Sequence, residues 1–135
     1  IPKKNILISS GPTRSKVELL NSTRMLIEKG YNIYSTAGTA KFFKENGIDT
    51  QILYWPDEDK EPNIMEYLHD RRIDLVINIP KNHTKRELDN GYKIRRAAVD
   101  YNIPLITNAR LASAFIYAIC KVDPSEIAIK SWDEY

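Results

Sequence analysis

Three loops of this sequence carry residue types that bind small anions. The first is the run from Ser9 to Lys16, where Lys16 falls in the first turn of an expected helix. A lysine is unfavourable beside the positive end of a helix dipole, so its presence there makes more sense if an anion binds nearby. Taken alone, this loop favours a solvated surface lysine, which is the common case. Thr13 or Ser15 could cap the helix.

The second loop, from Ser35 to Ala40, lies between an expected strand and an expected helix. Thr36 and Thr39 offer hydroxyl groups, and Gly38 lets a ligand approach the backbone closely. The start of the helix adds free N–H groups, so the loop predicts a neutral cradle for phosphate or carboxylate. An ordinary helix cap with a tight turn is the alternative.

The third loop begins at Asn78, which ends an otherwise apolar strand. A buried asparagine needs a hydrogen-bond partner, either local backbone or a ligand. Lys81 and Lys85 follow and add positive charge. The three loops together predict a pocket for a small anion.

Other residues give weaker signals. Trp55 could line one side of this pocket, or it could simply pack against the hydrophobic core, as tryptophan usually does. His69 and His83 have no matching cluster of acids or cysteines, so no metal site is expected. Cys120 falls near core positions and is expected to pack rather than react.

Hydrophobic periodicity predicts the elements that position these loops. Strands are expected at 5–9, 32–35, 51–54, 74–78 and 104–107, and helices at about 19–30, 39–46, 64–68, 94–101 and 111–119. Apolar strands that alternate with helices indicate an α/β fold, a doubly wound three-layer sandwich around a five-stranded parallel sheet. Ligands of such sheets bind beyond the carboxyl ends of the strands, where all three loops should meet.

Length and composition limit the possibilities further. The 135 residues suit one domain, and the first residue is Ile1, so we expect residues 1–135 to be a fragment of a longer chain. A net charge of +2, with basic and acidic residues interspersed, does not favour nucleic acid as a partner. No apolar stretch is long enough for a membrane span. A single cysteine fits a reducing compartment, and we expect a cytoplasmic protein.

The stretches 34–40, 74–80, 92–100 and 103–108 resemble, in order and spacing, the C-terminal regulatory domain of carbamoyl-phosphate synthetase large subunits, which has a methylglyoxal-synthase-like fold. The resemblance implies a non-catalytic domain that binds an anionic effector: UMP or IMP in bacterial relatives, N-acetylglutamate in the urea-cycle type, and UTP or phosphoribosyl pyrophosphate in the fused pyrimidine-pathway type.

The resemblance also implies effector-binding residues in this chain. They are Lys16, Thr36, Gly38, Thr39, Trp55, Asn78, Lys81 and Asn90. Trp55 and Asn90 favour a pocket that binds a compound like N-acetylglutamate. Lys16 and Lys81 favour phosphate, and Lys81 stands where the urea-cycle type has an asparagine.

The rest of the parent enzyme would supply the chemistry. It makes carbamoyl phosphate from bicarbonate, ammonia or glutamine, and ATP, for pyrimidine or arginine synthesis. ATP, magnesium and potassium are therefore expected outside this domain, together with the remaining synthetase domains and a glutaminase subunit as partners. No cofactor is expected in this domain.

The main alternative is a methylglyoxal-synthase-type lyase that acts on dihydroxyacetone phosphate. That reaction needs a carboxylate base at the substrate carbon. The stretch from Pro80 to Lys85 contains none, and the next carboxylate along the chain is Glu87. The sequence therefore favours effector binding. An inosine-monophosphate cyclohydrolase domain would need a longer chain, and a receiver domain would need paired acids after the first strand.

Overall fold

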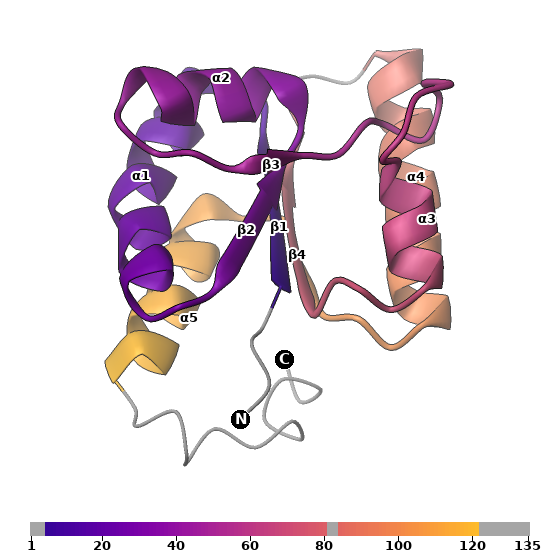
Figure 1. The fold of residues 1–135 in the computed structure, drawn as a ribbon. Helices are drawn as coiled ribbons and strands as arrows, with labels where there is room; N and C mark the ends of the chain where they lie inside the picture. The colour runs from indigo at the N-terminus through magenta and orange to yellow at the C-terminus, as the bar shows by residue number, and fades with distance from the viewer. Residues whose placement is uncertain (1–4, 81–83, 122–135) are drawn as a thin grey trace.

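The computed structural model describes residues 5–80 and 84–121, in which five strands alternate with five helices. They are β1 (Asn5–Ser10), α1 (Thr13–Glu28), β2 (Asn32–Ser35), α2 (Ala37–Glu45), β3 (Gln51–Ile52), α3 (Ile64–His69), β4 (Leu75–Ile79), α4 (Lys85–Asp100), β5 (Leu105–Ile106) and α5 (Ala109–Lys121). Figure 1 shows the sheet edge-on between two layers of helices, so the predicted three-layer α/β sandwich is confirmed.

The five strands form one parallel sheet in the order β3-β2-β1-β4-β5. The chain first builds outward from β1 through β2 to β3, then returns to the other side of β1 for β4 and β5. Strand order therefore reverses between β1 and β4, where Ser9 lies opposite Asn78. Crevices that bind ligands form beyond the carboxyl ends of the strands at such a reversal.

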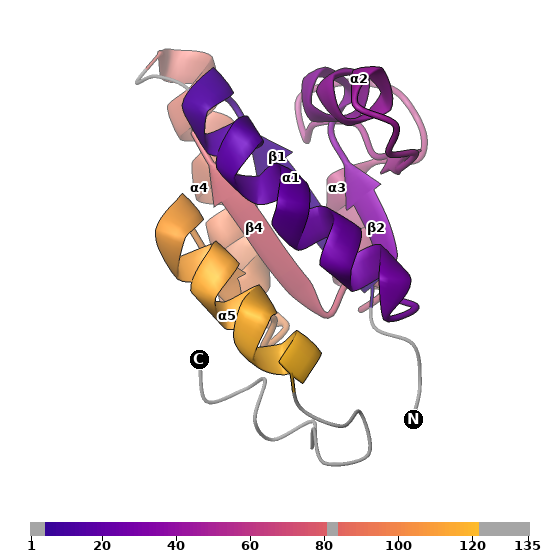
Figure 2. The same ribbon diagram turned by 90° about the vertical axis from the view of Figure 1, so that its left-hand side faces the viewer.

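Successive side chains of a strand point to opposite faces of the sheet, so the hydrophobic core is divided between the two faces. Ile6 and Ile8 of β1 pack with α1, α2 and α5, whereas Leu7 packs on the opposite face with α3 and α4. Figure 2 shows α1 and α5 side by side over the first face. Because both faces are covered, the central strands are apolar at nearly every position, which made them visible in the sequence.

Glycines end the first two helices as predicted. Gly30 and Gly47 adopt φ of 90° and 82°, a region that a residue with a Cβ rarely occupies. In the turn after α1, the Gly30 N–H donates to Ile27 O and the Tyr31 N–H donates to Leu26 O, which completes a Schellman motif. These turns send β2 and β3 back along the sheet.

Several boundaries differ from the sequence predictions; β5, for example, covers Leu105–Ile106 only. β3 covers Gln51–Ile52 only, paired with Tyr34 and Ser35 at the end of β2, although the Leu53 N–H still donates to Ser35 O. α2 begins at Ala37 rather than Thr39. α4 begins at Lys85, nine residues before the apolar stripe that predicted it, because its first turns are solvated and polar. Thr84 caps this helix by accepting a hydrogen bond from the Glu87 N–H.

Candidate functional site

A cavity of about 200 Å³ opens beyond the carboxyl ends of β1, β2 and β4. Six of the eight predicted effector-binding residues line it: Lys16, Thr36, Gly38, Thr39, Trp55 and Asn78. Lys81 lies outside the described residues. Asn90 is described but is not among the lining residues. The sheet thus brings together the three loops that the sequence analysis identified.

Hydroxyl groups connect the end of β1 to the start of α2. The Ser9 and Thr36 hydroxyl groups lie 3.0 Å apart and share a buried hydrogen bond. The Ser10 N–H donates to the Thr39 hydroxyl oxygen at 3.0 Å, and the same hydroxyl donates to Ser10 O at 3.3 Å. Thr39 is therefore occupied in holding the wall of the cavity, in addition to lining it.

On the other side of β1, the Gly11 N–H donates to Ile79 O at 2.9 Å and joins the ends of β1 and β4. Asn78 is half-buried beside this bond, and its side chain has no hydrogen-bond partner among the described residues. The Ser10 hydroxyl is 2% exposed and also lacks a partner there. Buried polar groups are usually satisfied, so both side chains are available to a ligand.

Two helices begin at the cavity without the features that usually satisfy a helix N-terminus. Both α1 and α2, as described, have no side-chain cap and no acidic residue in the first turn. The expected cap at Thr13 or Ser15 is wrong, because α1 begins at Thr13 and Pro12 occupies the cap position. The other three helices are capped by the side chains of Asn63, Thr84 and Asn108. The start of α2, whose Thr36, Gly38 and Thr39 line the cavity, therefore brings free N–H groups and a positive dipole end to it, whereas α1 contributes Lys16.

Lys16 adds a full positive charge to this edge. Its ammonium group lies 5.9 Å from the centroid of the Phe42 ring, on the exposed side of α2. A cation over an aromatic face gains a modest stabilisation that helps to hold the side chain in place. No described residue forms an ion pair with Lys16.

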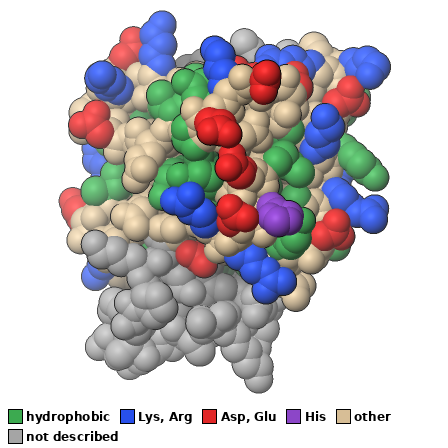
Figure 3. Space-filling model, turned by 45° about the vertical axis from the view of Figure 1, so that its right-hand side comes forward, with side chains coloured by type: hydrophobic (Ala, Val, Ile, Leu, Met, Phe, Trp, Pro, Cys, Tyr) green, Lys and Arg blue, Asp and Glu red, His purple; other side chains and the backbone are tan. Residues whose placement is uncertain are grey.

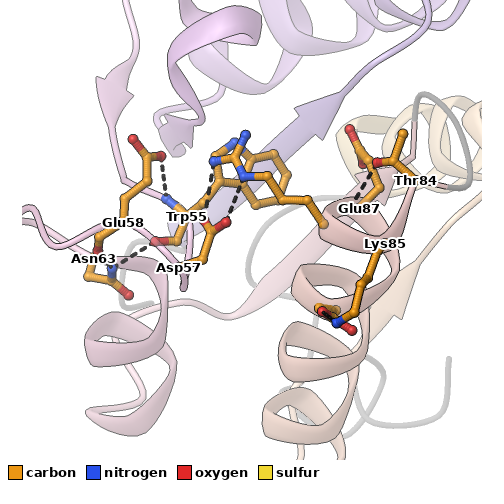
Figure 4. A network of polar contacts seen from close by, with 9 residues as sticks. Trp55, Asp57, Glu58, Asn63, Thr84, Lys85 and Glu87 are labelled. Carbon is orange, nitrogen blue, oxygen red and sulfur yellow. Dashed lines mark hydrogen bonds and ion pairs between the residues drawn. The ribbon is translucent and has the colours of Figure 1, made fainter.

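The loop that carries Trp55 is held at several points. The Trp55 N–H donates to a Glu58 carboxylate oxygen, and the Asn63 side-chain amide donates to Trp55 O. The loop is also joined to α4, because the Arg86 guanidinium donates two hydrogen bonds to the Asp57 carboxylate, at 2.6 and 3.1 Å. This hydrogen bonding lowers the pKa of Asp57 below its usual value. Figure 4 shows this network beside the start of α4.

Asn90 lies behind this loop rather than in the cavity. Its side chain contributes to lowering the pKa of Asp57, and its Oδ1 atom is buried without a partner in the described part of the chain. The residue is 4% exposed.

One lining residue lies outside both Trp55 and the three loops that the sequence analysis identified. Glu87 comes from the first turn of α4 and places a carboxylate at the wall of the cavity. The sequence analysis noted its position in the chain but not its direction, because α4 was expected to begin later. The capping pattern from Thr84 to Glu87, in which a threonine precedes a glutamate by three residues, was the signal that could have located it.

The remaining candidate groups give no sign of metal binding in the part of the chain that the structure describes. No group of three His, Cys, Asp or Glu side chains that could hold a metal ion occurs in residues 5–80 and 84–121. Burial raises the pKa of the Cys120 thiol, as expected for a packing residue. None of the described helices is long and apolar enough to cross a membrane. Figure 3 shows basic and acidic side chains interspersed over the face that carries α3 and α4.

Two solved structures share the fold at low sequence identity. Methylglyoxal synthase from Elizabethkingia anophelis superimposes with a TM-score of 0.60 at 18% identity, covering 84% of this chain and 77% of that one. The structure of ForH superimposes with a TM-score of 0.61 at 14% identity and covers 98% and 90% of the two chains.

Closer sequence relatives are much longer proteins. Multifunctional protein ura1 of Schizosaccharomyces pombe is 42% identical over 128 residues, which cover 90% of this chain and 6% of that protein. The C-terminal section of the carbamoyl phosphate synthase large chain of Methanocaldococcus jannaschii is 38% identical over 121 residues, or 90% and 19% of the two chains. The chain therefore spans a small part of the multi-domain relatives that it matches.

The sequence model of one domain family covers most of the chain. It matches residues 18–107, from within α1 to just after β5; the cavity-lining residues Ser9, Ser10, Gly11 and Lys16 precede this range. Together with the shared fold and the relatives above, this match shows that the chain belongs to the MGS-like domain family.

Proposed function

We propose that this chain is an effector-binding domain that takes up a small anion at the cavity formed by β1, β2 and β4. The proposal rests on which helices lack a side-chain cap at the N-terminus. Of the five helices in the described residues, only the two that begin at the cavity have neither a side-chain cap nor an acidic first turn. A bound anion would satisfy their free N–H groups and favour their dipoles.

We further propose that the anion regulates a carbamoyl phosphate synthase. The support comes from relatives named as carbamoyl phosphate synthase large chains and as multifunctional proteins, of which this chain corresponds to a small part. The catalytic domains, their ATP and metal ions, and a glutaminase partner would then lie outside the 135 residues. Effector binding would change the synthetase rate through the contact between the domains.

The cavity contains features for two classes of anion. Lys16 and the two helix N-termini suit a phosphate, on which several N–H groups and one ammonium group can converge. Trp55 suits the acyl chain of a compound such as N-acetylglutamate. Asn90 does not line the cavity, which removes one of the two residues that favoured the second class.

A ligand screen by thermal unfolding tests the proposal. UMP, IMP, UTP, phosphoribosyl pyrophosphate and N-acetylglutamate should be compared with the wild-type chain and with Lys16→Ala. A ligand present at 100 times its dissociation constant stabilises the folded state by about 2.7 kcal/mol. We expect at least one ligand to raise the melting temperature of the wild-type chain by several degrees and that of Lys16→Ala by clearly less. No stabilisation by any of them would contradict effector binding.

Glu87 gives the lyase alternative one observation in its favour, because the cavity does contain a carboxylate. A base must lie within hydrogen-bond reach of the proton that it removes. We nevertheless expect no turnover, and an assay for methylglyoxal formation from dihydroxyacetone phosphate decides the matter. Production at enzymatic rates that is lost in Glu87→Gln would establish the lyase.

A further inference from the structure

Glu87 is an unexpected residue in a cavity built for an anion. Its carboxylate carries the same charge as the proposed ligand, and it lines the cavity together with Lys16. No ion pair joins the two side chains, so Lys16 does not neutralise Glu87. A negative charge at this position weakens the binding of a bare anion, which requires an explanation.

The local explanation for a glutamate at this position fails. Thr84 and Glu87 have the spacing of a capping box, in which the glutamate side chain folds back onto the N–H group of the cap residue. The structure contains only the first half of this motif, the bond from the Glu87 N–H to the Thr84 hydroxyl at 3.3 Å. The Glu87 carboxylate has no hydrogen-bond partner among the described residues. It is therefore free to meet a ligand.

The position of Glu87 is also fixed before any ligand binds. Thr84 holds its backbone N–H, and its neighbour Arg86 is held by two hydrogen bonds to Asp57 on the Trp55 loop. Figure 4 shows Glu87 on the first turn of α4, with Asp57 and Trp55 on the loop after β3. These contacts hold the backbone of Glu87, and its carboxylate, which has no partner among the described residues, can accept strong hydrogen bonds from hydroxyl or N–H groups.

We propose that Glu87 determines the specificity of the cavity by binding hydrogen-bond donors on the body of the ligand. The anionic group lies at Lys16 and the N-termini of α1 and α2, and hydroxyl or N–H groups of the same molecule donate to Glu87. Ligands with a second anionic group at the Glu87 end are excluded by charge repulsion. This inference rests on the proposed function and names the class of ligand: a monoanionic-headed or phosphate-headed compound with donors in its body.

Three simple probes separate the two parts of the proposal. Methyl phosphate has the anionic group without donors, ribose 5-phosphate adds hydroxyl groups, and glutarate adds a second carboxylate. Dissociation constants are measured from amide chemical shifts of the chain, which also locate each probe. A hydrogen bond to a charged acceptor is worth roughly a tenfold change in affinity, so the wild-type chain should bind ribose 5-phosphate about tenfold tighter than methyl phosphate.

Substitution of Glu87 should change these affinities in opposite directions. In Glu87→Gln the preference for ribose 5-phosphate should shrink, and in Glu87→Ala it should disappear. Methyl phosphate and glutarate should bind both variants as tightly as wild type or tighter, because a like charge is gone. Glu66→Gln is the matched control, since Glu66 occupies the first turn of α3, is exposed and does not line the cavity. It should change none of the three affinities.

The outcomes distinguish this inference from the proposed function. If methyl phosphate binds at α2 but the preference for ribose 5-phosphate survives in Glu87→Ala, the role of Glu87 is refuted and anion binding stands. If no probe perturbs the amides at the start of α2, the proposed function itself fails. All measurements are made with EDTA and repeated with Mg²⁺. A preference that appears only with Mg²⁺ would make Glu87 a metal ligand and overturn the proposal.

Discussion

Gly38 has no structural reason to be glycine. Its φ is not positive, and a Cβ built on it would meet nothing within 4 Å. It lies in the first turn of α2, where glycine costs helix stability relative to alanine. Yet Gly38 lines the cavity, so the space beside its backbone is the feature that a side chain would remove. We propose that Gly38 leaves room for a ligand to approach the backbone.

Gly38→Ala should therefore separate binding from stability. We expect the free energy of unfolding to stay the same or rise by up to about 1 kcal/mol, because alanine favours the helix. The affinity for the effector should fall, because the methyl group occupies ligand space. Gly91→Ala is the control: Gly91 is also helical with no atom within 4 Å of a built Cβ, but it does not line the cavity. Equal affinities in the two variants would show that Gly38 contacts no ligand.

Thr39→Val should lower the free energy of unfolding. Losing a ligand contact alone would leave the stability of the free protein unchanged. The substitution removes the acceptor for the Ser10 N–H, which is buried, and an unsatisfied buried donor costs about 1–3 kcal/mol. Chemical denaturation measures this loss. Thr23→Val should cost less, because the Thr23 hydroxyl donates to Leu19 O within α1 and its removal leaves no backbone donor unpaired. An unchanged unfolding free energy in Thr39→Val would mean that the bond to Ser10 contributes nothing.

At the scale of elements, the loop between β3 and α3 and the first turns of α4 behave as one wall of the cavity. Asp57 and Arg86 join them, and Trp55 and Glu87 line the cavity from the two sides of this joint. Both charged side chains are largely exposed, so the pair is worth little in overall stability. Its effect should instead be on the position of Trp55.

Asp57→Asn should loosen the Trp55 loop, with a pH dependence that identifies the carboxylate. The folded-state pKa of Asp57 lies below its unfolded value of 3.8, because the ionised form accepts hydrogen bonds from Arg86. Its contribution is therefore present above that pH and is lost as the pH falls through the folded-state pKa. Wild type and variant should differ in the Trp55 indole NMR signal at pH 7 and converge only as the pH falls through the folded-state pKa, which lies below 3.8. Asp59→Asn, in the same loop, should resemble wild type throughout.

At the scale of the molecule, one face of the sheet carries both the main core and the cationic wall of the cavity. Phe42 and Phe43 of α2 illustrate the division. Phe43 is fully buried in the cluster with α1 and α5, whereas Phe42 packs at its margin and lies beneath the Lys16 ammonium group. Of these two adjacent residues, Phe43 packs in the hydrophobic core and Phe42 contacts a residue that lines the cavity.

Alanine at each position should expose this division. Phe43→Ala should lose about 3–5 kcal/mol of unfolding free energy, the usual cost of removing a core aromatic ring. Phe42→Ala should lose less stability but weaken effector binding by roughly two- to fivefold, because the cation–π contact that positions Lys16 is worth about 0.5–1 kcal/mol. Thermal unfolding and titration of the same two variants provide the measurements. Equal affinities in Phe42→Ala and wild type would show that the ring does not position Lys16.

The sequence by itself determined the layers of the fold and most of the cavity. Buried parallel strands are apolar on both faces, so β1 and β4 stand out as continuous runs, and Gly30 and Gly47 mark the helix ends. In a parallel sheet every loop that follows a strand reaches the same edge. That rule alone placed Lys16, Thr36 and Asn78 in one pocket, which the structure reproduces.

The tertiary structure decided what those side chains are free to do. Hydrogen bonds between segments distant in sequence engage Thr39 with Ser10 and Arg86 with Asp57, and no local pattern predicts such pairs. The direction of Glu87 depends on where α4 begins, and a polar first turn gives no apolar periodicity from which to read that point. Periodicity reports burial, whereas the partners of polar groups depend on the packing of whole elements. The sequence therefore located the cavity, and only the fold showed which of its groups remain available to a ligand.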